Sequence, residues 1–185
     1  MMDFPILETK RLILRKLTIN DTSDVFNYFS KEEVAKYTDL EKFTTIKQAE
    51  KLINSFNKQF RNGIRWGILL KKNNKIIGSC GFHHCNLQRL DVWNYKVEIG
   101  YELTPEYWKK GIMTEALTEI IKYGFNKLSI NRIEALIIPE NIGSIKLIEK
   151  IGFKKEGLLK EYRYEKNNFI DCYIYSILKN KSKLK

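Results

Sequence analysis

The most regular pattern in the chain is an alternation of apolar and polar residues from Trp93 to Thr104. Its apolar positions are Trp93, Tyr95, Val97, Ile99, Tyr101 and Leu103. Because successive side chains on a strand point to opposite faces, this spacing predicts a half-buried strand with Glu98 on its polar face. Apolar residues at helical spacing follow and predict a helix from Gly111 to Leu128.

The rest of the chain divides in the same way into strand patterns and helix patterns. Strands are predicted at residues 9–17, 64–71, 75–82, 132–138, 153–161 and 169–178, with a turn at Asn167 and Asn168. Helices are predicted at residues 22–37 and 46–62, and a last helix starts near Asn141. Gly152 is expected to end it in a left-handed conformation. The mixture predicts one α/β domain over residues 1–179 and a basic, mobile tail at residues 180–185.

Length and composition support a single domain that is expected in the cytoplasm. A chain of 185 residues, 43% of them hydrophobic, can supply one core. Three cysteines do not make a disulfide framework, which fits a reducing compartment. The first residues lack the layout of a signal peptide, and no apolar run reaches membrane-spanning length. We therefore expect no membrane association.

The net charge of +11 raises the alternative of a nucleic-acid-binding protein. Several of the positive charges fall in the tail, at Lys179, Lys181, Lys183 and Lys185. Lysine also far outnumbers arginine, whereas recognition of bases and phosphates favours the arginine fork. A phosphorylated ligand explains part of the charge more simply, so a dedicated nucleic-acid role is not expected.

The turn from Trp108 to Thr114 is a candidate anion-binding site. The first turn of a helix has backbone N–H groups without partners, and Gly111 allows close approach of another group. Lys109 and Lys110 add positive charge at the same place. The simpler alternative is that these lysines are only solvated. The glycine spacing matches neither a Walker loop nor a dinucleotide-binding fingerprint.

A second helix start, at Asn141 and Ser144, has the same ambiguity. Alone, Asn141 reads as a simple N-cap. These two residues belong to a longer series, Asn141-x-x-Ser144-x-x-Leu147-x-Glu149-Lys150-x-Gly152-Phe153. Two further motifs are Glu98-Ile99-Gly100-Tyr101 and residues 105–116. Together these motifs resemble the GCN5-related N-acetyltransferase (GNAT) superfamily. Residues 8–15 and 171–178 look most like its ribosomal-protein N-terminal alanine/serine acetyltransferase branch.

The resemblance implies a fold and a set of binding residues. It implies a mostly antiparallel sheet whose central strands, residues 93–103 and 132–138, splay apart to admit acetyl-coenzyme A. The turn 109–114 would hold the pyrophosphate, strand-edge groups near Tyr101 and Leu103 the pantetheine arm, and Asn141 would orient cofactor or substrate. The implied cofactor-binding set is Tyr101, Leu103, Trp108, Lys109, Lys110, Gly111, Ile112, Met113, Thr114, Asn141 and Ser144.

The resemblance also implies two catalytic residues, Glu98 and Ser144. Glu98 would take the proton of the amine, directly or through water, and Ser144 would donate to the leaving thiolate. The simpler alternative for Glu98 is an ion pair with a neighbouring lysine at the surface. Three positions depart from the wider family pattern: Trp108, Met113, and Lys109 in place of a more usual glycine.

Two other clusters of side chains need separate interpretations. Cys80, His83, His84 and Cys85 have metal-binding side chains, but alternation on a strand sends them to opposite faces, so no metal is expected. His83 or His84 could instead line the acceptor cleft. Tyr162, Tyr164, Tyr173 and Tyr175 could line that cleft too, although packing is the preferred interpretation.

The predicted activity is acetyl transfer from acetyl-coenzyme A to a primary amine, by direct attack in a ternary complex. The cysteines lack a recognisable activating context, so no acetyl-enzyme is expected. The acceptor candidates are a protein N-terminus, ribosomal or other, and a small amine such as a polyamine, an antibiotic or a metabolite. A non-catalytic coenzyme A-binding module and a basic ribosome-associated module are the rivals, and the sequence does not choose between monomer and homodimer.

Overall fold

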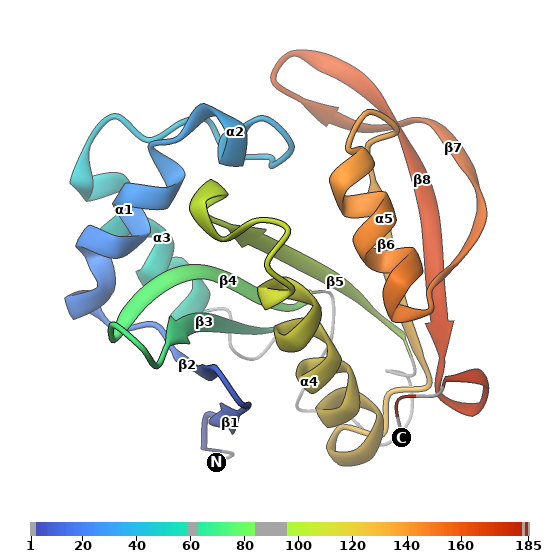
Figure 1. The fold of residues 1–185 in the computed structure, drawn as a ribbon. Coiled ribbons are helices and arrows are strands. Elements are labelled where there is room, and N and C mark those ends of the chain that lie inside the picture. Colours follow the sequence, from blue (N-terminus) through green and yellow to red (C-terminus); the bar gives the residue numbers. More distant parts are fainter. Residues whose placement is uncertain (1–2, 59–62, 84–95, 183, 185) are drawn as a thin grey trace.

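Eight strands form one sheet in the computed structural model, which describes residues 3–58, 63–83, 96–182 and 184 (Figure 1). The strands are β1 (Leu7–Glu8), β2 (Leu12–Lys16), β3 (Ile64–Leu70), β4 (Lys75–His83), β5 (Lys96–Leu103), β6 (Arg132–Ile137), β7 (Lys154–Glu165) and β8 (Asn168–Leu178). Their order in the sheet is β1-β2-β3-β4-β5-β6-β8-β7. Neighbours pair antiparallel except β5 and β6, which confirms the mixed, mostly antiparallel sheet.

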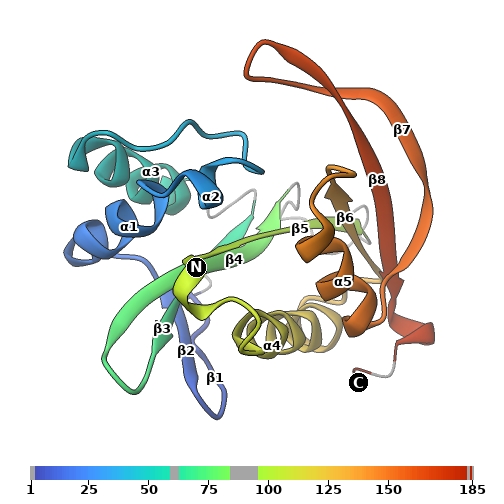
Figure 2. The same cartoon turned by 45° about the horizontal axis from the view of Figure 1, so that its top comes forward.

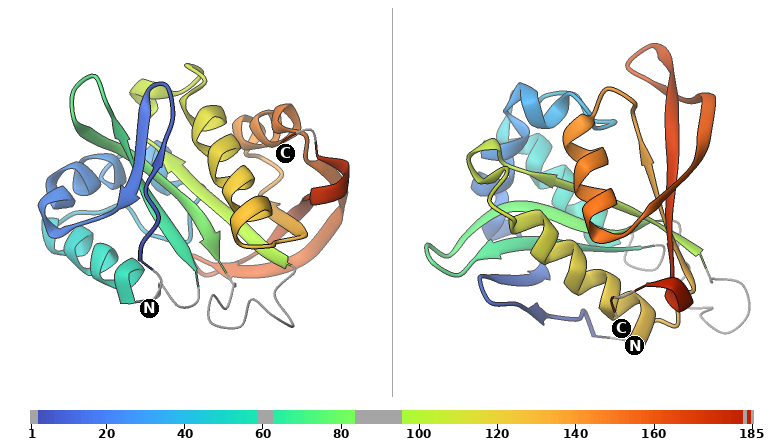
Figure 3. Two further views of the ribbon diagram at one scale, coloured as in Figure 1. Left: turned by 90° about the horizontal axis from the view of Figure 1, so that it is seen from below. Right: turned by 45° about the vertical axis from the view of Figure 1, so that its right-hand side comes forward.

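Helices cover both faces of this sheet. They are α1 (Thr22–Phe29), α2 (Glu32–Ala35), α3 (Ile46–Lys58), α4 (Ile112–Lys127) and α5 (Ile142–Ile151). Figures 2 and 3 show α1, α2 and α3 on one side of the sheet and α4 and α5 on the other. Each side has its own apolar cluster, one including α4 and one including α1 and α3. The sheet is therefore buried on both faces over its central strands.

The alternation in β5 decides which residues face α4. Val97, Ile99 and Leu103 are buried in the apolar cluster of α4, as the period of two predicts. The polar face differs from the expectation at its far end, where Glu102 is only 7% exposed. Helices α1 and α3 cover the polar face of β5 at this end. The alternation within β5 gives no sign of that cover.

The parallel pairing between β5 and β6 is short. It joins Lys96–Glu98 to Arg132–Glu134, and among the described residues no pair follows Glu98 and Glu134. The rest of β5, as far as Leu103, and the rest of β6, as far as Ile137, therefore separate. The predicted splay of the central strands is present.

Two predicted elements are interrupted. The strand expected at residues 9–17 is present only as β2, because residues 9–11 form a bend that joins it to its antiparallel partner β1. The helix expected at residues 22–37 ends at Phe29, and α2 begins after Lys31, whose φ of −92° and ψ of 128° are extended. That break lets the Lys31 ammonium reach the Thr104 hydroxyl at 3.1 Å. Residues 59–62 and 93–95, at the ends of two other predicted elements, lie outside the described residues.

The remaining predicted elements agree with the structure except at the last hairpin. There the strand expected to end at residue 161 continues to Glu165, and the turn lies one residue before the predicted Asn167 and Asn168. Gly152 ends α5 with φ of 114°, as expected for a left-handed cap. Lys166 and Asn167 turn the chain between β7 and β8 with φ values of 49° and 64°. The long hairpin reaches past α5 towards α2, with its tip at the top of Figure 1. There the Lys166 ammonium donates to the Ala35 carbonyl at 2.7 Å.

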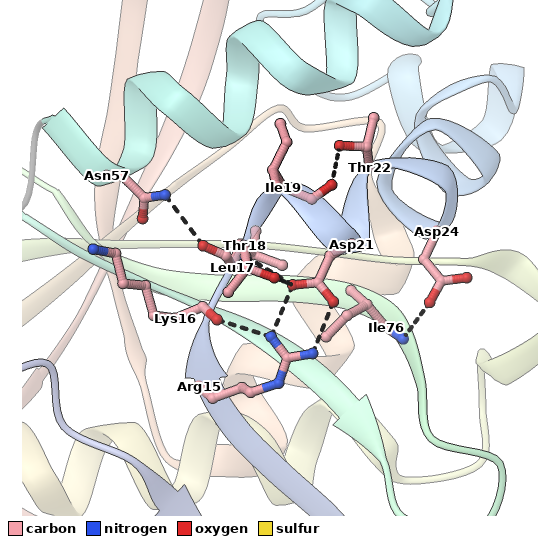
Figure 4. A network of polar contacts seen from close by, with 10 residues as sticks. All are labelled: Arg15, Lys16, Leu17, Thr18, Ile19, Asp21, Thr22, Asp24, Asn57 and Ile76. Carbon is pink, nitrogen blue, oxygen red and sulfur yellow. Dashed lines mark hydrogen bonds and ion pairs between the residues drawn. The ribbon is translucent and has the colours of Figure 1, made fainter.

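A polar network fixes the entry into α1 (Figure 4). The Arg15 guanidinium donates to both oxygens of Asp21 at 2.8 and 2.7 Å, and the Thr18 N–H donates to the same carboxylate at 2.7 Å. Burial alone would raise the pKa of Asp21, but these hydrogen bonds outweigh it and the pKa is lowered. Asp21 is thus a buried, charged anchor between β2 and α1.

The chain end follows β8 through a 3-10 turn, Lys179–Lys181. Ser182 is buried and Leu184 packs against the apolar cluster of α4, so part of the predicted basic tail is held against the core. Within the described ranges, no helix combines the length and the apolar character needed to cross a lipid bilayer.

Candidate active site

A cavity of about 380 Å³ opens where β5 and β6 separate. It is in the range of small-molecule sites. Its walls come from β5, the turn before α4, the starts of α4 and α5, and the segment around α2. The lining residues include Glu33, Tyr37, Thr38, Tyr101, Glu102, Leu103, Trp108, Lys109, Gly111, Ile112, Met113, Thr114, Asn141, Ser144, Lys146 and Lys150. Ten of the eleven predicted cofactor-binding residues are in this set, and Lys110 is not.

The turn before α4 has a backbone that few residues adopt. Gly111 is the N-cap with φ of 71°, and Lys109 has φ of 58°. Glycine adopts such values easily, whereas a residue with a Cβ is strained there by about 1–2 kcal/mol. The glycine that is more usual at position 109 would relieve this strain. Ile112, Met113 and Thr114 line the cavity in the first turn of α4, where backbone N–H groups have no partner within the helix.

A polar clamp holds this turn against the N-terminal strands. Glu115, in the first turn of α4, accepts from the Thr9 hydroxyl at 2.6 Å, from the Arg11 backbone N–H at 2.8 Å and from the Arg11 side chain at 2.6 Å. Arg11 also donates to the Lys110 carbonyl at 2.9 Å. Burial raises the pKa of Glu115, but these hydrogen bonds lower it further than burial raises it. Glu115 therefore stays charged and fixes the start of α4.

Trp108 closes the same turn onto β5. Its indole N–H donates to the Leu103 carbonyl at 2.7 Å, while 42% of the residue is exposed. The Trp108 ring thus lies over the end of β5 and contributes one wall of the cavity. The departure from the family pattern at this position supplies a hydrogen bond that keeps the turn in place.

The start of α5 combines capping with a contact to β5. The Asn141 side-chain oxygen accepts from the Ser144 N–H at 3.1 Å, so Asn141 is an N-cap as well as a cavity residue. The Ser144 hydroxyl lies 2.5 Å from the Tyr101 hydroxyl. Burial raises the pKa of Tyr101 above its usual range. Tyr101 is thus a neutral phenol that can donate to Ser144.

Glu98 does not lie among the cavity-lining residues. Its carboxylate forms an ion pair with Arg163 of β7, and Arg163 also lies 3.5 Å from Glu165. The strand register sets Glu98 opposite His83, and no shift of register interrupts the pairing of β4 with β5. Glu98 is therefore on the predicted polar face, next to the point where β5 and β6 separate.

Cys80 and His83, the two described members of the cysteine and histidine cluster, lie on opposite faces as the alternation predicts. Cys80 is buried in the apolar cluster of α4, and burial raises the pKa of its thiol to about 12. His83 lies on the opposite face, where its Nε2 is 2.9 Å from Arg65. His84 and Cys85 lie outside the described residues. Among the residues that the structure does describe, no three His, Cys, Asp or Glu side chains group to hold a metal ion.

The tyrosines of the last two strands do not share one role. Tyr175 is buried and its hydroxyl donates to Glu149 at 3.1 Å, which confirms the packing interpretation for this residue. Tyr162 and Tyr164 are 53% and 62% exposed. They are not core residues, and the packing interpretation is wrong for them. The ring of Tyr164 packs against that of Phe169, which is likewise exposed, at 4.9 Å between centroids.

Sequence reasoning missed several residues that build the site. Glu102 lines the cavity, and Arg65 of β3 holds it in an ion pair. Arg11 holds the turn before α4, and Arg163 holds Glu98. Each of these contacts joins segments far apart in the sequence. The only local signal was the position of Glu102 on the polar face of β5.

The comparisons with known proteins identify the family. The acetyltransferase (GNAT) domain matches residues 11–154. The chain belongs to the GNAT acetyltransferases. It is 41% identical over 178 residues to the uncharacterized N-acetyltransferase YoaA of Bacillus subtilis (strain 168), which covers 95% of this chain and 98% of that protein. This GNAT chain is therefore an acyltransferase of the N-acetyltransferase type.

Two further similarities concern the branch and the fold. The [ribosomal protein uS5]-alanine N-acetyltransferase of Escherichia coli (strain K12) is 34% identical over 111 residues, 60% of this chain and 55% of that protein. The crystal structure of a GNAT-family acetyltransferase from Bacillus anthracis superposes with a TM-score of 0.83 at 29% identity, over 96% of this chain and 100% of that one. GNAT relatives of this chain thus include ribosomal-protein acetyltransferases.

Proposed function

We propose that this GNAT chain transfers the acetyl group of acetyl-coenzyme A to a primary amine by direct attack in a ternary complex. The observation that carries the proposal is the cavity at the separation of β5 and β6, which the starts of both α4 and α5 reach. Helix starts favour negative charge. A diphosphate and a departing thiolate are both negative, and each would meet one of these helix ends.

The residues present fit a coenzyme A. The N–H groups of the turn ending at Thr114 would bind the pyrophosphate, and Lys109, Lys146 and Lys150 line the same cavity with positive charge. The edge of β5 from Tyr101 to Leu103, no longer paired to β6, would bind the pantetheine arm. The bound cosubstrate supplies the activated acetyl group, and the protein holds it between the strands.

Acetyl transfer requires two proton movements. The amine must lose a proton before its lone pair attacks the carbonyl carbon, and Glu98 would take that proton directly or through water. The C–S bond then breaks, and the Ser144 hydroxyl would donate to the thiolate. Tyr101, 2.5 Å from Ser144, would return a proton to it. The proton that the nitrogen loses after the attack would restore the Tyr101 phenol through solvent. An α-amine with a pKa near ~8 needs less help from Glu98 than a lysine near ~10.4.

For the acceptor, we propose the N-terminal α-amine of a protein, with a ribosomal protein as the first candidate. The ribosomal-protein acetyltransferases among the relatives support this choice, and a reducing cytoplasm would be the place of reaction. The alternative acceptor is a small-molecule amine.

Thiol release from acetyl-coenzyme A tests the proposal. The acceptors are peptide amides that begin with alanine or serine, spermidine, and an aminoglycoside, with mass spectrometry to locate the acetyl group. Amine-dependent thiol release with an acetylated peptide N-terminus is the expected result. Release with spermidine or the aminoglycoside alone would assign a small-molecule acceptor, and release with none of them would refute acetyl transfer to amines.

A further inference from the structure

A buried polar cluster crosses β3, β4 and β5 on the face that α1 and α3 cover. Its centre is Arg65, whose side chain is 9% exposed. The guanidinium donates to the Ser79 hydroxyl at 2.8 Å and pairs with Glu102, which also accepts from Ser79. The third contact is His83 Nε2 at 2.9 Å. Because a guanidinium only donates, Nε2 must accept, which puts the proton of the neutral ring on Nδ1.

The strands leave space for this cluster by carrying glycine. A Cβ on Gly100 would lie 2.7 Å from His83 Nε2 and 3.0 Å from the Arg65 guanidinium. Gly81, the partner of Gly100 across the strands, would place a Cβ 3.0 Å from the Arg65 side chain. Arg65 therefore lies flat across a pair of glycines, with the Phe56 ring of α3 at 5.3 Å above it. The cluster is built into the sheet.

Glu102 connects this cluster to the cavity. It is only 7% exposed, yet it lines the cavity beside Glu33 of α2. Burial raises the pKa of Glu102, and Arg65 and Ser79 offset only part of that rise. Burial raises the pKa of the Tyr28 hydroxyl, and the negative charge of Glu102 raises it further. Arg65 and Ser79 are the hydrogen-bond partners of this carboxylate, and they offset only part of what burial costs its charged form.

The cavity therefore has one wall with positively charged side chains and one wall with negatively charged side chains. The turn before α4 and helix α5 supply Lys109, Lys146 and Lys150, whereas α2 and β5 supply Glu33 and Glu102. A phosphorylated cosubstrate fits the first wall. A cation fits the second, because a positive charge beside Glu102 would complete the compensation that Arg65 begins.

We propose that Glu102, held in place by Arg65, binds the acceptor amine in its protonated, ammonium form. The inference rests on the proposed acetyl transfer and specifies its substrate class: acceptors that carry positive charge at or next to the reacting nitrogen. The bound ammonium gives one proton to Glu98 or to its ordered water before the nitrogen attacks. Glu102 is thereby a specificity residue and Arg65 a positioning residue.

Steady-state kinetics with a trialanine amide as acceptor tests this inference. Glu102→Gln keeps the shape and can still accept from Arg65, so we expect the KM for the peptide to rise at least tenfold. The kcat should stay within about threefold and the affinity for acetyl-coenzyme A should not change. Arg65→Lys should raise the same KM to a smaller extent. Glu106→Gln, which removes an exposed carboxylate close by in the sequence, is the matched control and should leave both constants unchanged.

A KM within twofold of the unmodified protein, in a folded Glu102→Gln variant that binds acetyl-coenzyme A normally, would overturn the inference and leave the proposed function intact. A fall in kcat at constant KM would overturn it as well, since that would place Glu102 in proton transfer. If Glu102→Gln does not fold, Glu102→Asp takes its place: the shorter acid should raise KM by an intermediate factor, and an unchanged KM would count against the inference. An unmodified protein that acetylates no amine refutes the proposed function first.

Discussion

The Tyr101 hydroxyl of β5 lies 2.5 Å from the Ser144 hydroxyl of α5, across the cavity where β5 and β6 separate. This hydrogen bond joins a strand of the sheet to the helix that follows β6. The two residues are 43 positions apart in sequence, and both belong to the predicted cofactor-binding set. Their contact brings two separate sequence signals together in one hydrogen-bonded pair.

We expect Ser144→Ala to lower kcat about 10–100-fold while the affinity for acetyl-coenzyme A stays nearly constant, because a proton donor acts mainly in the transition state. Tyr101→Phe should lower kcat through the same step. The double variant should then lose less than the product of the single losses. Calorimetric affinities and turnover numbers of the three variants check this. Independent, multiplicative losses would mean that the two hydroxyls do not act as a pair.

Glu98→Gln should remove most activity at neutral pH and recover part of it at alkaline pH, where more of the acceptor is already deprotonated. Arg163 and His83 face Glu98 and are unchanged in this variant. Arg163→Lys, which keeps a positive partner, is the control and should keep the wild-type shape of the pH–rate profile. A Glu98→Gln profile identical to that of the unmodified protein, at equal folding stability, would leave solvent as the proton acceptor.

Lys109→Gly should raise the free energy of unfolding by about 0.5–1 kcal/mol. The change removes a left-handed strain of about 1–2 kcal/mol, and the greater freedom of glycine in the unfolded chain offsets part of it. Lys110→Gly is the matched control, because Lys110 is not among the described residues with positive φ and should only lose stability. Urea unfolding measures both changes. Equal losses in the two variants would contradict strain at position 109.

Asp21→Asn should lower the free energy of unfolding by about 1–3 kcal/mol at neutral pH, since it breaks a buried, charge-assisted network. The lowered pKa of Asp21 sets the sign of the pH dependence. Its contribution is complete above the unfolded pKa near ~3.9 and disappears as pH falls through the lower folded pKa. Wild type and variant should therefore converge in acid. Asp171→Asn, at an exposed ion pair, is the control and should change stability little.

Local patterns predicted the strands and helices well, because each depends on neighbouring residues. The alternation in β5 and the left-handed cap at Gly152 are of this kind. The break at Lys31 was not predictable, because its extended backbone goes with a contact to Thr104, more than 70 residues away. Likewise, nothing near Glu102 in the sequence indicates that Arg65 lies beside it. The family resemblance located the cavity residues, and the contacts between distant segments remained to be found in the structure.

The short parallel pairing of β5 with β6 has a mechanical consequence. Long antiparallel ladders tie β2 to β3, β4 and β5 on one side, and β6 to β8 and β7 on the other. Among the residues that the structure describes, only three residue pairs of the strand ladder join these two halves. The weakest line through the sheet therefore runs beside the cavity. A molecule that forms hydrogen bonds to both β5 and β6 would act as a substitute strand. Binding of such a molecule should therefore stabilise the two halves of the sheet against separation. Amide hydrogen exchange in β5 and β6 would slow most when the site is filled.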